Sequence, residues 1–397
     1  MKLLNSTPIQ HVEQGESGMR GWKAFRHARR LRTLPSLDQI DRLLIVKSSS
    51  IGDIVHALPV VEAIKKAKPG ITIGWVVRKR CADVLTGNPN IDRLHLVDNK
   101  PQLGDLLRLR RELHAQHYQC ALDMQGLFLS GVYAWLSGAK ARIGIDRNRE
   151  NNALFMTHPI VLGKPEGKRA PKRRPGAPAP VQDPDRHAVD ILYGFAELLG
   201  VWIDHDDFPP QHYLGEGAPA HLLDPVHAAS GPKVALNVGA SSKYKQWPVE
   251  HWISLAGSLA VAGKTVVFVG DKRDGIVVKD IIDGMRFKEG VIDLSGKTKL
   301  RQLAAVLDAC DVVVTGDTGP MHIAVAVGTP VIALFGSTNP DRTGPYGKRN
   351  VVLDMRIHCS PCYRRPTCHG RVDCMREITP NGVLGAVEEK LRKREEI

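Results

Sequence analysis

Short apolar runs rich in β-branched residues alternate with segments of helical periodicity from residue 42 onward. This alternation is typical of βαβ units that build a parallel sheet. The pattern predicts strands at residues 42–47, 71–77, 93–98, 119–124 and 159–162, and, after a restart at Gly231, at 233–238, 264–270, 290–295, 311–316, 330–335 and 350–355. It predicts helices of the second half at about 248–262, 274–284, 299–309 and 319–327. The fold class is therefore α/β, with two Rossmann-like, doubly wound parallel sheets.

A polar, proline-containing stretch at residues 206–225 separates the two halves as a linker. The length of 397 residues suits two domains. We expect them, with their appendages, as a basic N-terminal extension over 1–40, a first domain over 41–215, a second domain over 216–380 and a C-terminal helix over 381–397. Domains of this kind that face each other place their C-terminal strand ends at a cleft, where ligands bind.

The net charge of +13, with a pI near 9.4, stands out in an otherwise ordinary globular composition. It fits a nucleic-acid binder, a protein at an anionic membrane surface or an enzyme with polyanionic substrates. Residues 20–32 hold six Lys or Arg and no acid, and residues 164–174 hold six and one Glu, which together account for +11. The first block is compatible with an amphipathic helix at a membrane surface, and the second lies in a Pro-rich loop at 164–184. Solvated charge that aids solubility is the alternative for each block.

No segment has the pattern of a signal peptide or a membrane span, so we expect a cytoplasmic protein. Nucleotide motifs of two common kinds are missing as well. The GKT triplets at 263–265 and 296–298 lack the first glycine of a P-loop, and no G-x-G-x-x-G follows the first strand. Cys81, Cys120 and Cys310 lie singly within apolar or helical patterns and are predicted to be inert core thiols.

The first segment with candidate chemistry, residues 47–66, follows the first strand directly. It holds Ser48, Ser49 and Ser50, then Gly52 and Asp53 at a helix start. Small residues permit the close approach of a ligand, and helix-start amides bind anions. Asp53 is either the N-cap of that helix or, since it faces the predicted cleft, a carboxylate that removes a proton from an alcohol.

The second segment repeats this order of strand, small polar loop and helix in the other half. Ser241 and Ser242 can donate hydrogen bonds to phosphate oxygens, and Lys243 and Lys245 can neutralise a diphosphate. Trp247, which follows them, is predicted to pack beneath the loop rather than to stack on a base.

The third segment spans residues 315–347. Asp317, Thr318 and Gly319 end a strand and open a helix, whose free amides and positive dipole end suit a phosphate. His322 lies one step inside this helix. It is either a buried histidine satisfied by the backbone or within reach of the same ligand, and the surrounding strand–turn–helix pattern favours the ligand.

Taken together, the three segments resemble glycosyltransferase family 9, the ADP-heptose:lipopolysaccharide heptosyltransferases of the GT-B fold, and its heptosyltransferase II-like members in particular. The resemblance covers about residues 42–355 and rests on four motifs. These are the SSxGD turn (Ser49, Ser50, Gly52, Asp53), D-x-Q-G (Asp123, Gln125, Gly126), a lysine ahead of a Trp-Pro pair (Lys245, preceded by Ser241 and Ser242) and D-T-G-x-x-H (Asp317, Thr318, Gly319, His322).

The resemblance implies an inverting transfer of heptose from ADP-heptose to a Kdo or heptose hydroxyl of the lipopolysaccharide inner core. Asp53 would be the catalytic base, and the serine turn, Gln125 and Gly126 would lie on the acceptor side. The donor would be held by the second and third segments, with Asp274 in place of the family's ribose-binding glutamate and Thr298 beside it. No cofactor is required for the transfer, since Lys245 and the helix amides accept the charge of the departing ADP.

The same resemblance implies an acceptor on lipid A, and therefore peripheral contact with the cytoplasmic face of the inner membrane. Basic blocks beside the cleft would attract anionic lipid, each cation contributing roughly 1 kcal/mol near the surface. We expect no nucleic-acid partner.

Four further cysteines form a C-x2-C-x5-C-x5-C run, Cys359, Cys362, Cys368 and Cys374. In a cytoplasmic protein this pattern favours a structural thiolate metal site, for zinc or iron, over disulfides. Free thiols are the alternative, and His358 and His369 are alternative ligands.

Two other functions are compatible with parts of the sequence. A GT-B enzyme with another nucleotide sugar, such as an epimerase, would share the fold. A nucleic-acid binder would explain the charge, but aromatic residues make up only 5% of the chain and do not alternate with the basic runs, as a stacking single-strand binder requires.

Overall fold

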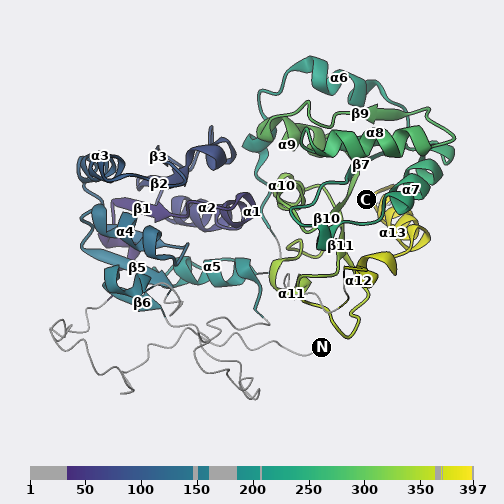
Figure 1. The fold of residues 1–397 in the computed structure, drawn as a ribbon. Coiled ribbons are helices and arrows are strands. Elements are labelled where there is room, and N and C mark those ends of the chain that lie inside the picture. Colours follow the sequence, from purple (N-terminus) through teal and green to yellow (C-terminus); the bar gives the residue numbers. More distant parts are fainter. Residues whose placement is uncertain are drawn as a thin grey trace.

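The computed structural model describes residues 34–145, 151–160, 186–205, 208–362, 368 and 370–395. Both basic blocks, 20–32 and 164–174, lie outside the described residues, so the expectations placed on them remain predictions. Two α/β domains lie side by side, the N-terminal one on the left of Figure 1 and the C-terminal one on the right.

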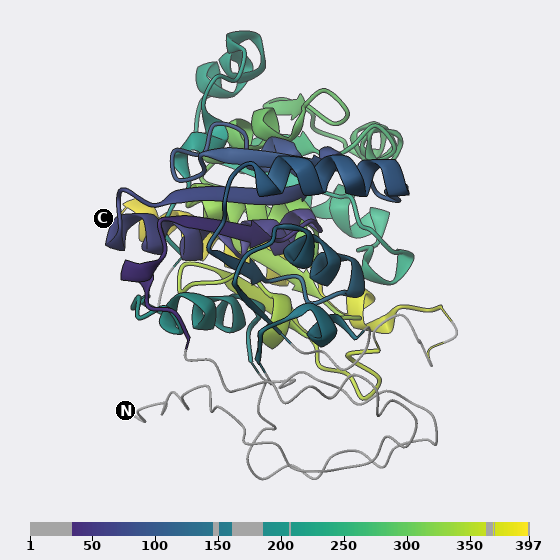
Figure 2. The same ribbon diagram turned by 90° about the vertical axis from the view of Figure 1, so that its left-hand side faces the viewer.

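The N-terminal domain is built on a parallel six-stranded sheet of order β3-β2-β1-β4-β5-β6, seen in front in Figure 2. Its strands are β1 (Arg42–Val46), β2 (Thr72–Arg78), β3 (Arg93–Val97), β4 (Cys120–Asp123), β5 (Ala141–Ile145) and β6 (His158–Ile160). Its helices are η2 (Leu37–Gln39), α1 (Ile51–Val55), α2 (Leu58–Ala67), η3 (Lys79–Val84), α3 (Leu103–His114), α4 (Phe128–Leu136), η4 (Asn152–Phe155) and α5 (Ala188–Glu197). The sequence pattern predicted five of these strands and missed β5.

Alternating residues of the central strand face opposite layers of helices. Leu43 and Ile45 of β1 belong to the core cluster that includes residues of α1, α2 and α5, whereas Leu44 and Val46 pack with α3 and α4. All four side chains are fully buried. Burial on both faces explains why the strands of this parallel sheet read as continuous apolar runs.

The C-terminal domain repeats the same topology, with the sheet order β9-β8-β7-β10-β11-β12. Its strands are β7 (Lys233–Asn237), β8 (Thr265–Val269), β9 (Val291–Asp293), β10 (Val312–Gly316), β11 (Val331–Phe335) and β12 (Val351–Asp354). Its helices are η5 (His212–Gly215), α6 (Ala220–Ala228), η6 (Lys243–Lys245), α7 (Val249–Val261), α8 (Asp274–Gly284), α9 (Leu300–Asp308), α10 (Gly319–Val327), α11 (Pro340–Thr343), α12 (Asp373–Arg376) and α13 (Pro380–Glu395). Every strand and helix predicted in this half overlaps an observed one.

The stretch predicted as a linker at 206–225 is structured where it is described. It contains η5 and the start of α6, and η5 packs against α9. Tyr213 of η5 is buried and donates a hydrogen bond to the carbonyl of Val84 in the N-terminal domain at 2.7 Å. The segment therefore contacts both domains rather than only joining them.

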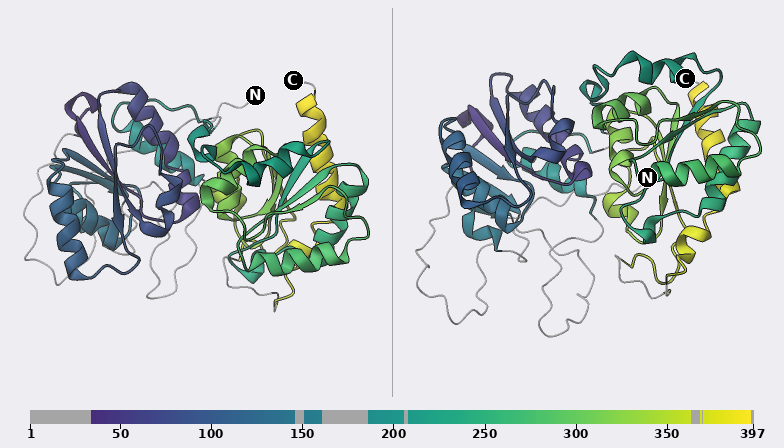
Figure 3. Two further views of the ribbon diagram at one scale, coloured as in Figure 1. Left: turned by 90° about the horizontal axis from the view of Figure 1, so that it is seen from above. Right: turned by 45° about the horizontal axis from the view of Figure 1, so that its top comes forward.

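The two domains meet through α1 and α10 (Figure 1), and Figure 3 shows the domains side by side from two further directions. The C-terminal helix α13 remains on the C-terminal domain, where Val383, Val387 and Leu391 join the core with α7. No helix within the described ranges is long and apolar enough to cross a bilayer.

Candidate functional site

The candidate site lies where the switch points of the two sheets face each other. In each sheet the first strand, β1 or β7, is central. The chain first adds strands on one side of it and then crosses to add the remaining strands on the other side, which makes the first strand the switch point. Ligands of doubly wound sheets bind at such points, outside the C-terminal strand ends. The serine turn follows β1, and the D-T-G-x-x-H motif follows β10, which pairs with β7.

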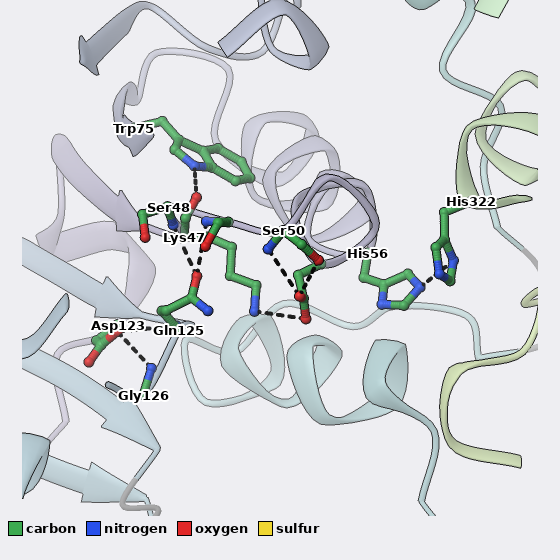
Figure 4. A network of polar contacts seen from close by, with 11 residues as sticks. Lys47, Ser48, Ser50, His56, Trp75, Asp123, Gln125, Gly126 and His322 are labelled. Atoms are coloured by element: carbon green, nitrogen blue, oxygen red, sulfur yellow. Dashed lines mark hydrogen bonds and ion pairs between the residues drawn. The ribbon is translucent and has the colours of Figure 1, made fainter. Parts of the chain in front are cut away.

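Asp53 is held at the start of α1 by Ser50 and Lys47. The Ser50 N–H and Oγ donate to Asp53 Oδ2 at 3.0 and 2.7 Å, and Lys47 Nζ lies 3.4 Å from Oδ1 (Figure 4). Ser50 is the N-cap, so Asp53 occupies the third helical position and closes a capping box. The prediction of Asp53 as the N-cap itself was wrong by three residues, but the capping contact exists. Its side chain remains 45% exposed, which leaves it accessible to a substrate.

The same contacts keep Asp53 ionised. Its surroundings raise the pKa through burial, but the charge of Lys47 and the hydrogen bonds from Ser50 outweigh this effect and hold the pKa of Asp53 well below its usual range. At neutral pH the Asp53 carboxylate is therefore unprotonated.

Lys47 is a site residue that the sequence analysis missed. Its side chain is only 3% exposed at the end of β1, and its backbone carbonyl accepts a hydrogen bond from Trp75 Nε1 at 2.9 Å. A buried lysine is rare unless it is paired. The signal in the sequence was a charged residue directly after an apolar strand.

Gln125 and Asp123 shape the serine turn from the neighbouring strand β4. Gln125 Oε1 accepts hydrogen bonds from the N–H groups of Ser48 and Ser49 at 3.1 and 3.2 Å, and Asp123 Oδ1 accepts from those of Gln125 and Gly126 (Figure 4). Asp123 is fully buried, which raises its pKa although these hydrogen bonds oppose the rise. The contacts observed for the D-x-Q-G motif therefore position the turn.

On the other side of the site, Lys245 is paired with the carboxylate of Asp317. Lys245 Nζ lies 2.5 Å from Asp317 Oδ2 and also donates to the Asp317 carbonyl at 3.3 Å. Thr338, in the loop after β11, donates to the same Oδ2 at 2.8 Å. Both charged side chains are nearly buried, at 13% and 12% exposure. The lysine predicted for the diphosphate is thus oriented by the aspartate of the next motif.

The start of α10 is fixed by a buried amide. Asn237, at the end of β7, donates to Thr315 Oγ1 at 2.8 Å and to Thr318 Oγ1 at 3.1 Å. Thr318 is the N-cap of α10, and Gly319 begins the helix. Asn237 is a second residue that sequence reasoning missed, because it lies within the apolar pattern of its strand.

His322 is buried and bonded to a histidine of the other domain, not satisfied by the backbone. His322 Nδ1 lies 2.9 Å from His56 Nε2, at the end of α1 (Figure 4). Burial lowers the pKa of His322 to about 4, although the carboxylates of Asp317 and Asp53 oppose this shift. Burial and the neighbouring histidines likewise lower the pKa of His56 well below its usual value. Two neutral imidazoles therefore share one hydrogen bond across the domain boundary.

Gly52 is required by this contact. A Cβ at Gly52 would lie 2.3 Å from Cδ2 of His322, closer than any side chain could tolerate. Gly52 was predicted to leave room for a ligand, and in the structure the space beside it is filled by the imidazole of His322.

The remaining predicted donor residues lie around the C-terminal ends of β7, β8 and β9. Ser242 caps η6, with its Oγ accepting from the Tyr244 N–H at 3.4 Å, and Ser241 is exposed. Asp274 packs against Gly239 of the β7 loop, since a Cβ there would lie 2.3 Å from its Oδ2. Thr298 lies in the half-buried loop between β9 and α9.

Trp247 is a packing residue, as predicted. It is 4% exposed, donates to the Ile378 carbonyl at 2.9 Å and meets the ring of Trp252 edge-on.

The four C-terminal cysteines are free and come together around one cavity beside α12. Burial and, to a smaller extent, the nearby thiols of the other three raise the pKa of Cys374 to about 11. Among the described residues, no three His, Cys, Asp or Glu side chains already stand in a metal-binding arrangement. Cys81, Cys120 and Cys310 are buried core thiols, as predicted.

A family model, glycosyltransferase family 9 (heptosyltransferase), matches residues 180–372. A lipopolysaccharide core heptosyltransferase of Haemophilus influenzae, OpsX, is 29% identical over 79% of this chain and 84% of its own. The chain matches glycosyltransferase family 9. It is therefore a glycosyltransferase, as the motifs predicted.

Solved structures of heptosyltransferases have the same two-domain GT-B fold. The Escherichia coli heptosyltransferase WaaC with ADP matches 88% of this chain and 99% of its own, at 25% identity and a TM-score of 0.66. The E. coli ADP-heptose lipopolysaccharide heptosyltransferase II matches 89% and 99%, at 21% identity and a TM-score of 0.67. The predicted fold is confirmed.

Proposed function

We propose that this glycosyltransferase moves a heptose from ADP-heptose to a sugar hydroxyl of the lipopolysaccharide inner core, with inversion at the anomeric carbon. The observation that carries the proposal is the ionised, half-exposed Asp53 at the switch point of one domain, opposite the Lys245–Asp317 pair of the other. Relatives that match most of this chain are lipopolysaccharide heptosyltransferases.

Asp53 would act on the acceptor. Its carboxylate takes the proton of a Kdo or heptose hydroxyl as the oxygen attacks the anomeric carbon and the bond to ADP breaks. Lys47 and Ser50 hold the carboxylate in place and keep it unprotonated before the attack. Ser49 and Ser50 flank the same turn and can orient the acceptor.

The C-terminal domain would bind the donor and stabilise the departing ADP. Lys245 and the free amides at the start of α10 supply positive charge where the diphosphate gains negative charge. Asp317 neutralises Lys245 in the absence of nucleotide, so the lysine exchanges part of this contact for a phosphate oxygen on binding. Ser241, Ser242, Asp274 and Thr298 complete the donor side in this proposal.

The transfer itself requires no metal in this scheme, since lysine and helix amides receive the charge. We assign the cysteine cluster a structural role.

The acceptor is an anionic glycolipid, so we propose peripheral association with the cytoplasmic face of the inner membrane. The charge of residues 20–32 and 164–174 supports this association. Removing residues 1–33 should weaken co-sedimentation with anionic vesicles, and it spares Leu37 and Ile40, which are buried in the core. Unchanged co-sedimentation would leave the first block without this role.

A donor screen tests the proposed function. The purified protein is incubated with ADP-heptose, or with UDP-N-acetylglucosamine, in the presence and absence of Kdo-lipid A, and nucleotide release is measured. We expect ADP release that depends on the acceptor and no UDP release. Release of UDP, or acceptor-independent turnover of a sugar nucleotide, would indicate a different GT-B enzyme.

A further inference from the structure

The four C-terminal cysteines take no part in the proposed transfer, yet their side chains surround a single cavity. Cys359, Cys362, Cys368 and Cys374 line it together with Tyr244, Gly336 and Ser337. The cavity has room for a sphere of about the size of one water molecule. A metal ion bound by four thiolates requires a space of this order.

Local packing brings the sulfurs in from separate turns. Cys374, on α12, is 7% exposed and lies so close to β11 that a Cβ at Gly336 would be 2.7 Å from its Sγ. Cys359 and Cys362 lie in the loop after β12. This loop contacts the same glycine, since Ser360 Oγ donates a hydrogen bond to the Gly336 carbonyl. These contacts hold both ends of the cluster against the sheet.

We propose that this cavity binds one thiolate-preferring divalent ion, zinc or ferrous iron, through Cys359, Cys362, Cys368 and Cys374. Four sulfur ligands in a small, mainly apolar space suit tetrahedral coordination by either ion. On binding, each thiol releases its proton to solvent and the thiolates draw together around the ion. This site goes beyond the proposed glycosyl transfer and does not depend on it.

The position of the cavity gives the metal a defined structural role. Tyr244 and Ser337 line it, and the residue after each of them contacts Asp317. Lys245 pairs with the Asp317 carboxylate at 2.5 Å, and Thr338 donates to it at 2.8 Å. A metal that fixes the cysteine loop against these two segments also fixes the lysine that faces the donor.

Metal analysis of the full-length protein tests the proposal. Protein from zinc- and iron-supplemented cells, purified without chelator, should contain about one ion per chain. Elemental analysis identifies the ion, and visible absorption distinguishes an iron–thiolate centre from colourless zinc. The double variant Cys359→Ser/Cys362→Ser should lose the ion and bind ADP several-fold more weakly, whereas Cys81→Ala, at a buried thiol outside the cluster, should keep it.

A measurement on the unaltered protein covers the case in which the double variant does not fold. Titration with a mercurial reagent should release the ion as the four cluster thiols react. Three results would overturn the proposal: protein without metal, equal metal in the wild type and a folded double variant, or disulfides among the four cysteines. None of these readouts uses glycosyl transfer, so they leave the proposed function to its own test.

Discussion

Individual charged residues of this site act in pairs. Asp53 is kept ionised by Lys47, and Lys245 is oriented by Asp317, so each domain contributes one ion pair to the candidate site. A charge that is nearly buried remains stable only with such a partner. In the proposed mechanism the two pairs have separate roles: the half-exposed Asp53 carboxylate acts on the acceptor, and the nearly buried Lys245 binds the donor.

The Lys245 assignment predicts a loss of donor binding on substitution. Lys245→Ala should raise the dissociation constant of ADP about 10- to 100-fold, since a hydrogen bond to a charged group is worth about 1.5–3 kcal/mol. Lys79→Ala is the matched control, because Lys79 is also paired with an aspartate, Asp98 at 2.9 Å, but lies in the N-terminal domain. Calorimetric titration with ADP measures both. Equal affinity in the two variants would remove Lys245 from the donor site.

For individual residues, the sequence analysis identified the site residues that lie in polar segments after strands. It missed the residues whose side chains hold those site residues in position. Asp53, Lys245 and Asp317 follow strands in polar segments, where chemistry is visible in the pattern. Lys47 and Asn237 lie at strand ends, and their partners, Asp53 and Thr318, become neighbours only when the chain folds. The pairing of His322 with His56, 266 positions apart, could not be predicted from spacing for the same reason.

Helices α1 and α10 form the element-scale connection between the domains. Their contact brings helix α1, which carries Asp53, against α10, the helix whose start we propose binds the donor. It depends on the glycine at position 52 and on the histidine pair. Any side chain larger than hydrogen at that glycine would separate the helices.

Gly52→Ala tests this connection. The added methyl would meet the His322 ring at 2.3 Å, so we expect a loss of about 1–3 kcal/mol in stability and a marked fall in transfer rate. Gly104→Ala, in α3, has no atom within 4 Å of the added Cβ and should stabilise the protein by up to about 1 kcal/mol. Thermal unfolding and ADP-release assays compare the two. Wild-type activity in Gly52→Ala would show that the contact is dispensable.

The strands and helices were predicted well because both faces of the parallel sheets are buried and most of the strands are continuous apolar runs. β5 was missed because its five residues, ARIGI, include an arginine and a glycine that interrupt the run. Its Arg142 side chain is satisfied locally, by the carbonyls of Ala139 and Phe155. The proline-rich stretch before α6 was predicted as a linker because composition does not reveal that η5 packs on α9.

At the scale of the whole molecule, two copies of one topology face each other with their switch points together. The sheet orders are the same in the two domains, so the first and fourth strands of each sheet are neighbours at its centre and flank its switch point. The positive charge noted in the sequence lies mostly outside the described residues, and the described core contains the site.

Buried histidines predict that stability falls with acidification. Burial is the leading cause that lowers the pKa of both His322 and His95 to about 4, and the pKa of His56 is lowered as well. These side chains stay neutral in the folded state while the unfolded chain takes up protons below about pH 6.5, so stability is lost from there toward pH 4. His205 opposes the trend: Glu197 and Asp190 raise its pKa overall, against the lowering effect of burial.

Urea unfolding at a series of pH values checks this expectation. The free energy of unfolding should decrease steadily between pH 6.5 and pH 4. A constant or rising value over that window would contradict the neutral, buried state of the histidine pair.

The central claim is that Asp53 removes the proton of the acceptor, and one comparison tests it most directly. Asp53→Asn and Asp41→Asn each replace a lysine-paired carboxylate, but Asp41 pairs with Lys68 far from the cleft. With ADP-heptose and Kdo-lipid A, Asp53→Asn should lower the turnover number about 10²- to 10⁴-fold with ADP affinity unchanged, whereas Asp41→Asn should match the wild type. Turnover of Asp53→Asn within a few-fold of wild type would contradict the account and leave Asp53 with only its structural role in the capping box.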